Sequence, residues 1–516
     1  MAAPNSLQTP LLEHVEAPTA ELNVPAQEPA PADVDAEAAC EQERDERAHA
    51  AMYARFTEPQ KRLILALVSF AGLTQMFVTG SFITSIPAVA REFESTPALI
   101  NLAVSASIIT GAFGMLVFST YSAWYGRRPI FLTMLPILIL GSIGTAAAHS
   151  VPSLVAWRIV QAFGASGGFS VGAGVIADVF PLEQRGRATG IFFSFAFLGP
   201  ALAPFVGGAV AHYASWRIMQ LSIGAASLIA LILFAIFFPE TSQPHSRGID
   251  KLRAEGHGSS ERSPLLGDCT EDEDGQEKEK FKWVWLNPFG FLGLLRGPNV
   301  MAVVICATVI LMAEHLLLNP LAYTLGARYG ISNEGLIGLC FLPSGVGNII
   351  GAPIAGRLSD IIIIRARAKR GTWVPEDRLR ASVPGVAALV PISLLGFGLT
   401  IRFIPGTAGL VVCLVLLFIH GVGIDYSLTP MSAYLVDILH SQSAQITAAS
   451  ACVRQLIIGV ATSAFIPAIE RIGVWWTNAI VAGLIWCSLV LYLATIRFGD
   501  RMRAWVDVGY STAANN

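Results

Sequence analysis

Charged residues are scarce in this sequence, and their scarcity excludes an ordinary water-soluble domain. They make up 14% of the chain, whereas a typical soluble protein carries about 25%. Hydrophobic residues make up 53%, and the mean hydropathy is +0.57. The net charge of −3 is small, so it predicts neither a nucleic acid nor another polyanion as a partner. This balance favours a membrane protein.

Several motifs of enzymatic chemistry are also missing. The seven cysteines are scattered singly, without the spacing of a zinc or redox site. No Gly-x-x-x-x-Gly-Lys-Ser/Thr loop occurs, which argues against an ATP-driven pump. No nucleophile–base set is visible, so we expect neither an enzyme nor a bound cofactor or metal. The first 60 residues lack the apolar run of a cleavable signal peptide, so the first membrane helix is expected to direct insertion.

Long apolar runs are what the sequence has instead. A bilayer core of about 30 Å is crossed by about 20 apolar residues of helix. The sequence predicts an all-α membrane protein with twelve transmembrane helices in two pseudo-symmetric six-helix halves. The runs lie near 63–87, 100–123, 129–148, 153–177, 187–211, 216–238, 298–325, 334–356, 382–403, 407–436, 444–469 and 474–497.

Polar segments separate and flank these halves. They are poor in the apolar residues that would offset chain ordering, so we expect disordered tails and a mobile linker. The predicted domains are a tail at 1–61, a half at 62–239, a linker at 240–297, a half at 298–497 and a tail at 498–516.

The basic residues of the loops predict the orientation. With the N-terminus in the cytoplasm, only five of the 34 Lys and Arg residues fall outside, and two lie within helices. The reverse orientation places the run Arg365–Arg370 outside, against the positive-inside rule. We expect cytoplasmic N- and C-termini and a multi-pass protein of the plasma membrane.

The two halves carry similar sequences at matching places. The fourth helix ends at Asp178 and the tenth at Asp437, while Gly126 and Gly356 follow the second and eighth helices. Two six-helix repeats of this kind are what alternating access by rocking halves requires.

Ionisable residues within the helices are candidate site residues, because each is costly in a bilayer and usually faces a cavity or a partner. Arg158 with Gln161, and Arg454 with Gln455, are predicted to bind substrate. A pair of guanidiniums binds carboxylates bidentately. The alternative is structural: Arg158 pairs with helix backbone or with Glu314 and only supports the architecture.

Acidic and histidine side chains are the candidates for proton coupling. Glu314 is favoured, because a buried carboxylate titrates near neutrality. Asp425 is the second candidate, with a structural hydrogen bond as its alternative. His315 could relay protons, although a lone membrane histidine is more often simply hydrogen-bonded.

The fifth helix combines glycine and proline in an unusual pattern. Glycine allows two helix backbones to approach, and proline removes a helical hydrogen bond. We expect a pliable seam between the halves there, with ordinary close packing as the alternative. The residues concerned are Gly199, Pro200, Pro204, Gly207 and Gly208.

Four patches together resemble the major facilitator superfamily, specifically the fungal members of its twelve-helix drug:proton antiporter group, over roughly 60–500. The patches are Tyr125–Pro129, Arg158–Gln161 with Gly164 and Gly167–Gly168, Gly199–Gly208, and a C-terminal set of Gly356–Asp360, Pro375–Leu379, Tyr434–Asp437 and Val453–Arg454.

The resemblance implies gating contacts at the loops after the second and eighth helices. Their predicted members are Gly126, Arg127, Arg128, Asp178, Gly356, Asp360 and Asp437. One position departs from the pattern, because Ala123 replaces an aspartate of the first loop motif. That replacement puts the contact in doubt in the first half. Arg127 and Arg128 could still bridge to Asp178, or could serve only as positive-inside anchors.

The cargo is predicted from resemblance alone. The runs Gly164–Asp178, Leu198–Pro204 and Ala211–Arg217 are most similar to fungal exporters of citrate and itaconate. That implies proton-linked export of a small organic acid by a functional monomer. The alternative in the same family is a multidrug or secondary-metabolite exporter. An alternative of another class is a membrane sensor or scaffold without transport.

Overall fold

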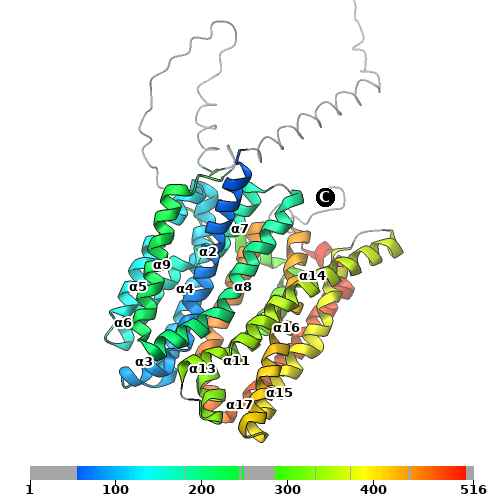
Figure 1. The fold of residues 1–516 in the computed structure, drawn as a ribbon. Coiled ribbons are helices and arrows are strands. Elements are labelled where there is room, and N and C mark those ends of the chain that lie inside the picture. The colour runs from blue at the N-terminus through cyan, green and yellow to red at the C-terminus, as the bar shows by residue number, and fades with distance from the viewer. Residues whose placement is uncertain are drawn as a thin grey trace, which may run out of the picture. The chain divides into compact units, whose positions relative to one another are not determined.

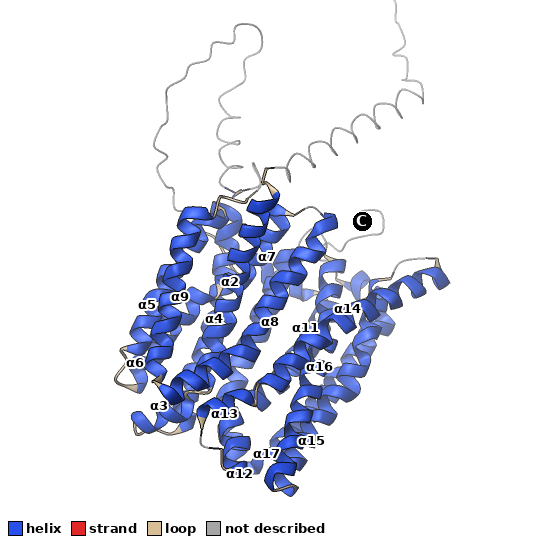
Figure 2. Cartoon of the chain, viewed as in Figure 1, coloured by secondary structure: helices blue, strands red, loops and turns tan. Residues whose placement is uncertain are grey.

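The computed structural model describes residues 55–180, 182–242, 247–248, 285–331, 333–371, 374–439 and 443–506. Within these ranges every regular element is a helix, and Figure 2 shows no strand among them. Most of the predicted tails and linker, at 1–54, 243–246, 249–284 and 507–516, lies outside the described residues. The all-helical fold class is confirmed.

The first half is built from long helices joined by short loops (Figure 1). Helices α6 and α7 together form one membrane span, which is interrupted at Ser166. The helices are α2 (Glu58–Ile83), α3 (Ile86–Glu92), α4 (Pro97–Tyr125), α5 (Arg127–Ala146), α6 (Val151–Ala165), α7 (Gly167–Val179), α8 (Leu182–Tyr213) and α9 (Trp216–Phe237).

The second half repeats this plan with more irregular helices. Short π-helical turns, η2 (Ala322–Gly326) and η4 (Gly385–Leu389), interrupt two of its spans. The remaining elements are η1 (Gly290–Arg296), α11 (Pro298–Leu318), α12 (Ala327–Tyr329), α13 (Glu334–Leu339), α14 (Leu342–Arg370), η3 (Pro375–Ser382), α15 (Val390–Phe403), α16 (Gly406–Ile438) and α17 (Ser443–Trp505).

Ten of the described helical stretches are long and apolar enough to cross a membrane, by length and composition. One of them, within α17, contains two helices, because Gly473 breaks the helical backbone with φ 83° and ψ 162°. The 32-residue α8 is not among the ten, yet it runs alongside the others in Figure 1. With these two adjustments the described helices follow the predicted two-times-six arrangement.

Helix ends differ from the predicted ones where capping decides them. The first span begins at Glu58 rather than near 63, because Thr57 and Gln60 form a capping box there. It ends at Ile83 rather than 87, and the short α3 follows it. The last helix continues beyond 497 to Trp505.

The two ends of the helix bundle differ in the side chains they carry, and we call them the basic end and the opposite end. The basic end is where α4 meets α5 and where α14 finishes in Arg365–Arg370. The opposite end carries α3 and α13 (Figure 1). The two largest apolar clusters lie mainly one in each half, and two smaller clusters combine residues of both halves. Large apolar side chains such as Ile236 and Val490 are 66% exposed, as expected of a surface that faces lipid.

The loop at the opposite end contains a carboxylate that stabilises the fold. Glu92 of α3 accepts hydrogen bonds from Trp216 Nε1 at 2.5 Å and from Arg217 Nη2 at 2.6 Å. Burial raises the pKa of Glu92, but these two bonds and the Arg217 charge outweigh it and hold the pKa below its ordinary value of 4.5.

We expect this contact to make the stability of the protein depend on pH. A carboxyl with a depressed pKa stabilises the fold above its unfolded pKa and loses that contribution as the pH falls. Acidification below pH 4.5 should therefore lower the thermal midpoint by a few degrees. Glu92→Gln should remove this part of the dependence, measured by intrinsic fluorescence of the purified chain. The matched control is Glu94→Gln, an exposed neighbour. Equal pH profiles for Glu92→Gln and the parent would contradict the assignment.

Candidate functional site

The two halves are joined by ion pairs at the opposite end. Glu334, the first residue of α13, is 6% exposed. Its Oε1 accepts from Arg91 Nη2 at 2.5 Å, and its Oε2 lies 3.0 Å from His212 Nδ1. Arg91 belongs to α3 and His212 to α8, so one carboxylate of the second half holds two helices of the first. We call this trio the outer clamp.

Backbone packing reinforces the outer clamp. A Cβ atom added at Gly208 of α8 would lie 2.3 Å from the Glu334 carbonyl oxygen. One added at Gly338 of α13 would lie 2.5 Å from the Pro204 carbonyl oxygen. Larger residues do not fit at either position. The predicted seam on the fifth helix therefore makes contact between halves through Pro204 and Gly208.

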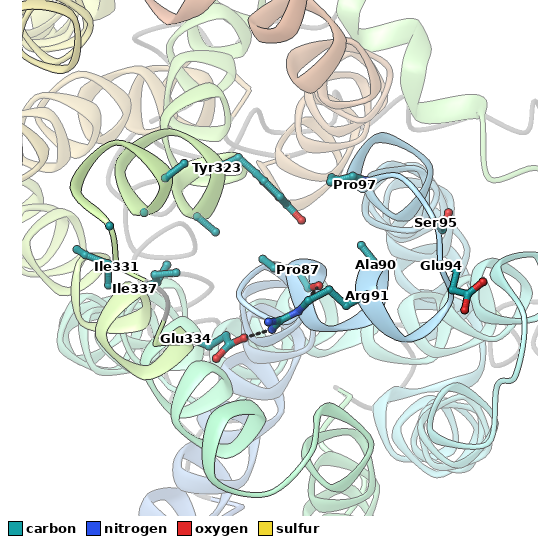
Figure 3. A pocket seen from close by; sticks show the side chains of 14 residues that line it. Pro87, Ala90, Arg91, Glu94, Ser95, Pro97, Tyr323, Ile331, Glu334 and Ile337 are labelled. Carbon is teal, nitrogen blue, oxygen red and sulfur yellow. Dashed lines mark hydrogen bonds and ion pairs between the residues drawn. The ribbon is translucent and has the colours of Figure 1, made fainter.

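A cavity of about 600 Å³ lies beside the outer clamp. Figure 3 shows Arg91 and Pro87 on one side of it and Tyr323 with Ile331 on the other. Its walls therefore come from both halves. It is lined mainly by apolar groups.

The other seam residues pack within the first half. A Cβ atom at Gly199 would lie 2.6 Å from Met76 Cβ, and one at Gly207 would lie 2.5 Å from the Ser81 carbonyl oxygen, both on α2. Pro200 lies inside α8. These contacts let α8 lie close against α2 while Gly208 meets α13.

At the basic end of the first half, the predicted gating residues come together. Arg127 Nε lies 2.8 Å from Asp178 Oδ2, and Nη1 donates to Ser122 Oγ at 2.7 Å. Arg128 donates instead to the Ala235 carbonyl oxygen at 2.8 Å. The contact between Arg127 and Asp178 thus forms although Ala123 replaces the expected aspartate.

A second carboxylate at this end was not foreseen from the sequence. Glu240 accepts from the backbone amides of Arg127 at 2.9 Å and Arg128 at 3.2 Å, at the N-terminus of α5. Gly126 has φ 105°, and a Cβ atom there would lie 2.5 Å from Glu240 Oε2. Glycine is therefore needed at 126 on two grounds.

The second half has an equivalent cluster. Arg378 lies 2.8 Å from Asp437 Oδ2 and 3.3 Å from Asp360 Oδ1. Asp437 ends α16 as Asp178 ends α7, so the two clusters match across the pseudo-symmetry. The prediction that Gly356 follows the eighth helix is wrong, because α14 continues past it to Arg370 and has Gly371, whose φ is 76°, as its C-cap. Gly356 packs loosely inside α14, with Thr429 Cγ2 3.9 Å from its would-be Cβ. Among the described residues, every ion pair recorded at the basic end stays within one half.

Arg158 lies in a buried polar network of the first half. It is fully buried, and its Nη1 donates to the Val78 carbonyl oxygen at 3.2 Å and to Gln161 Oε1 at 2.8 Å. The guanidinium lies 4.5 Å from the centroid of the Phe82 ring. Its Nε and Nη2 have no hydrogen-bond partner among the described residues.

Gln161 extends this network. Its Nε2 donates to Ser142 Oγ and to Gln220 Oε1, both at 2.9 Å. The buried side-chain amide of Gln161 thereby joins helices α5, α6 and α9. Its oxygen accepts the hydrogen bond from Arg158. This arrangement fixes the direction in which the arginine points.

The second half places two acidic residues near each other. Glu314 Oε1 of α11 accepts from Asn348 Nδ2 of α14 at 3.1 Å. Asp425 of α16 is 6% exposed and lies within coulombic range of Glu314. Its Oδ2 has no hydrogen-bond partner among the described residues. Three helices thus bring two acids and an amide together inside the second half.

Other predicted site residues are placed outside these clusters. His315 Nδ1 lies 2.9 Å from the Leu311 carbonyl oxygen of its own helix. Arg454 and Gln455 are half-buried on α17, and neither has a recorded hydrogen bond or ion pair with the described part of the chain. Both remain predictions as substrate-binding residues.

Sequence reasoning missed the outer clamp, Glu240, Arg378 and Asn348. Arg91 is one of the five basic residues predicted outside, and His212 lies in the run Ala211–Arg217, which served only for its resemblance. Neither pattern indicates a partner, because a charge near a helix end looks the same in sequence with or without one. The signal for Arg378 was present, since it lies in the quoted motif Pro375–Leu379. Asn348 carries no charge and gave no signal within its apolar run.

Comparisons with known proteins agree with this architecture. MFS antiporter QDR3 of Candida albicans is 22% identical over 555 residues, covering 87% of this chain and 79% of its own. Efflux pump radE of Floropilus chiversii is 24% identical over 446 residues, covering 85% and 80%. A solved bacterial homologue of the human lysosomal transporter Spinster, inward-facing and unoccupied, has TM-score 0.58 at 13% identity, covering 87% of this chain and 97% of that chain.

The family match extends over most of the sequence. The sequence profile of the Major Facilitator Superfamily matches residues 68–463, from the first span to the eleventh. The relatives are transporters and efflux pumps of fungi; a particular closeness to citrate or itaconate exporters is not found among those named here. The chain is therefore a membrane transporter that belongs to the major facilitator superfamily.

Proposed function

We propose that this transporter exports small organic molecules, secondary metabolites or drugs, from the cytoplasm by alternating access. The observation that carries this proposal is the placement of the ion pairs that join the two halves. Among the described residues, the recorded ion pairs that join the halves lie at the opposite end, in the outer clamp, whereas those recorded at the basic end stay within each half. The named relatives, an efflux pump and an antiporter, support export.

This arrangement corresponds to the state that is closed at the opposite end. Rocking of the two halves would break the outer clamp and bring the basic ends together. With the basic end in the cytoplasm, as loop charge predicts, cargo enters there and leaves past Arg91 and Glu334. The two basic-end clusters, around Arg127 and Arg378, keep each half rigid during the movement.

Proton coupling is assigned to the acid pair of the second half. An unpaired buried carboxylate is costly, so Asp425 needs a proton or a partner. Glu314 is held by Asn348, which belongs to α14, and α14 also packs against α8 of the first half. A change of charge at Glu314 and Asp425 is therefore transmitted through α14 to its contact with α8, which has to change when the halves rock. Export in exchange for protons follows.

A second candidate cargo is a small organic acid such as citrate or itaconate. The observation that favours it is the buried guanidinium of Arg158, whose Nε and Nη2 have no partner among the described residues. A carboxylate that reached Arg158 would satisfy both groups. The relatives named above support the first cargo class better.

Expression in a yeast host that lacks its own efflux pumps distinguishes the two candidate cargo classes. We expect the protein to lower the accumulation of amphiphilic metabolites severalfold, with no change in extracellular citrate or itaconate. The second candidate predicts the reverse, together with at least a tenfold loss of acid export, about 1.4 kcal/mol, in Arg158→Gln. The matched control is Arg402→Gln, an exposed arginine of α15. If neither class of compound moves in a correctly inserted protein, the export proposal is wrong.

A further inference from the structure

The end of α14 carries a group of exposed cations that the transport cycle does not use. Arg365, Arg367 and Lys369 are exposed, and none has a recorded hydrogen bond or ion pair with the described residues. The neighbouring Arg370, by contrast, lies 2.6 Å from Asp377 Oδ1. Figure 1 shows this end of α14 extending beyond the neighbouring helices.

Exposed isoleucines and exposed cations share one face of this helix, with Arg357 between Ile354 and Ile361. Ile354 is 50% exposed, Ile361 43% and Ile364 67%. Residues three or four apart share one face of a helix, so Ile361, Arg365 and Lys369 lie on the same side. Ser359, on the other side of the helix, is fully buried. This face therefore carries isoleucines side by side with cations, from Arg357 to Lys369.

The spacing along the helix fits a bilayer surface. A rise of about 1.5 Å per residue places Lys369 about 12 Å beyond Ile361. Over this length the long Arg and Lys side chains reach the headgroup phosphates, while the isoleucines beside them contact the ends of the acyl chains. An amphipathic segment with apolar residues on one face and basic residues beside them binds at this boundary, and each cation adds attraction to anionic lipid.

We propose that the last three turns of α14, Ile361–Arg370, bind the headgroups of anionic phospholipids in the leaflet at the basic end. The mixture of isoleucines and cations on one face favours a lipid over a soluble anion or a protein partner, because a lipid covers both with its acyl chains and its headgroup. The same helix contributes Asn348 to the acid pair, and α13 with Gly338 precedes it directly. Lipid held here therefore acts on an element that moves between the two states.

The test uses the purified full chain titrated with phosphatidylserine or phosphatidylcholine and read by native mass spectrometry. We expect Arg365→Gln with Lys369→Gln to reduce the preference for phosphatidylserine roughly 25-fold, because each cation contributes a factor of about five. The matched control is Arg62→Gln with Arg497→Gln. It removes two exposed cations of the same end from α2 and α17 and should keep the preference.

Three outcomes overturn the proposal. The preference could survive in the α14 variant, or it could fall equally in the control, which would indicate bulk charge. Inorganic phosphate at constant ionic strength could also displace the lipid, which would indicate a site for a free anion. Size-exclusion profiles and thermal midpoints confirm that both double variants are folded before the titration is read.

Discussion

Asp425→Asn is expected to abolish proton-driven transport while leaving the protein folded. The amide has the same shape as the carboxyl group, and it brings no charge into a site that is 6% exposed. Without an acid at this position the pair with Glu314 cannot take up a proton in one state and release it in the other. In proteoliposomes with an imposed pH gradient, the gradient-driven rate should fall at least tenfold, about 1.4 kcal/mol.

Exchange of labelled for unlabelled cargo without a gradient should continue in this variant, because it moves no net proton. The matched control is Glu470→Gln, an exposed acid of α17 with no recorded partner in the described chain. It should behave like the parent. A gradient-driven rate that survives in Asp425→Asn but is lost in Glu314→Gln would move the assignment to Glu314 alone. Survival in both would remove the acid pair from the coupling mechanism.

Gly338→Val is expected to have the largest effect on the conformational equilibrium. Its Cβ atom would lie 2.5 Å from the Pro204 carbonyl oxygen and 2.8 Å from Phe205 Cα, so closure of the halves at the opposite end becomes less favourable. Overpacking of this kind costs about 1–3 kcal/mol, which corresponds to a shift of about 5- to 150-fold towards the open state. Spin labels at positions 94 and 330, which both line the cavity at that end, should move apart.

Gly483→Val serves as the control, because a Cβ atom there meets nothing within 4 Å. Glu334→Gln should act in the same direction with a smaller effect, since it weakens the ion pair with Arg91 but leaves the backbone contacts in place. If Gly338→Val keeps the parent's distance distribution, these contacts do not stabilise the closed state. The proposal that the outer clamp closes the opposite end would then be wrong.

The predictions for Asp425 and Gly338 concern two different steps of the transport cycle. In the proposed cycle, Asp425 and Glu314 determine whether a proton accompanies the movement, and the outer clamp determines whether the opposite end is open. Asn348 is the structural link between them, because α14 carries it and also lies against α8. A double variant of Asp425→Asn with Gly338→Val should therefore show non-additive effects on the spin-label distances.

Much of the architecture could be predicted because the bilayer imposes it. A lipid core requires helices of a certain length, so twelve apolar runs predict the spans. Helix ends were less predictable. The first span starts at Glu58 because of Thr57 and Gln60, and Gly473 joins two helices without a loop. Such details depend on single hydrogen bonds and dihedral angles rather than on hydropathy.

The sequence by itself determined the family, the pairing of the two halves and the identity of the intramembrane charges. It also named Asp178 and Asp437 as matching positions, because repeats preserve local patterns. Only the tertiary structure decided which groups are partners. The partners are Glu240 with Arg127, Arg378 with Asp437, and Glu334 with Arg91, which lie 113, 59 and 243 positions apart in the chain. Contacts over such distances arise from helix packing, and no local pattern records them.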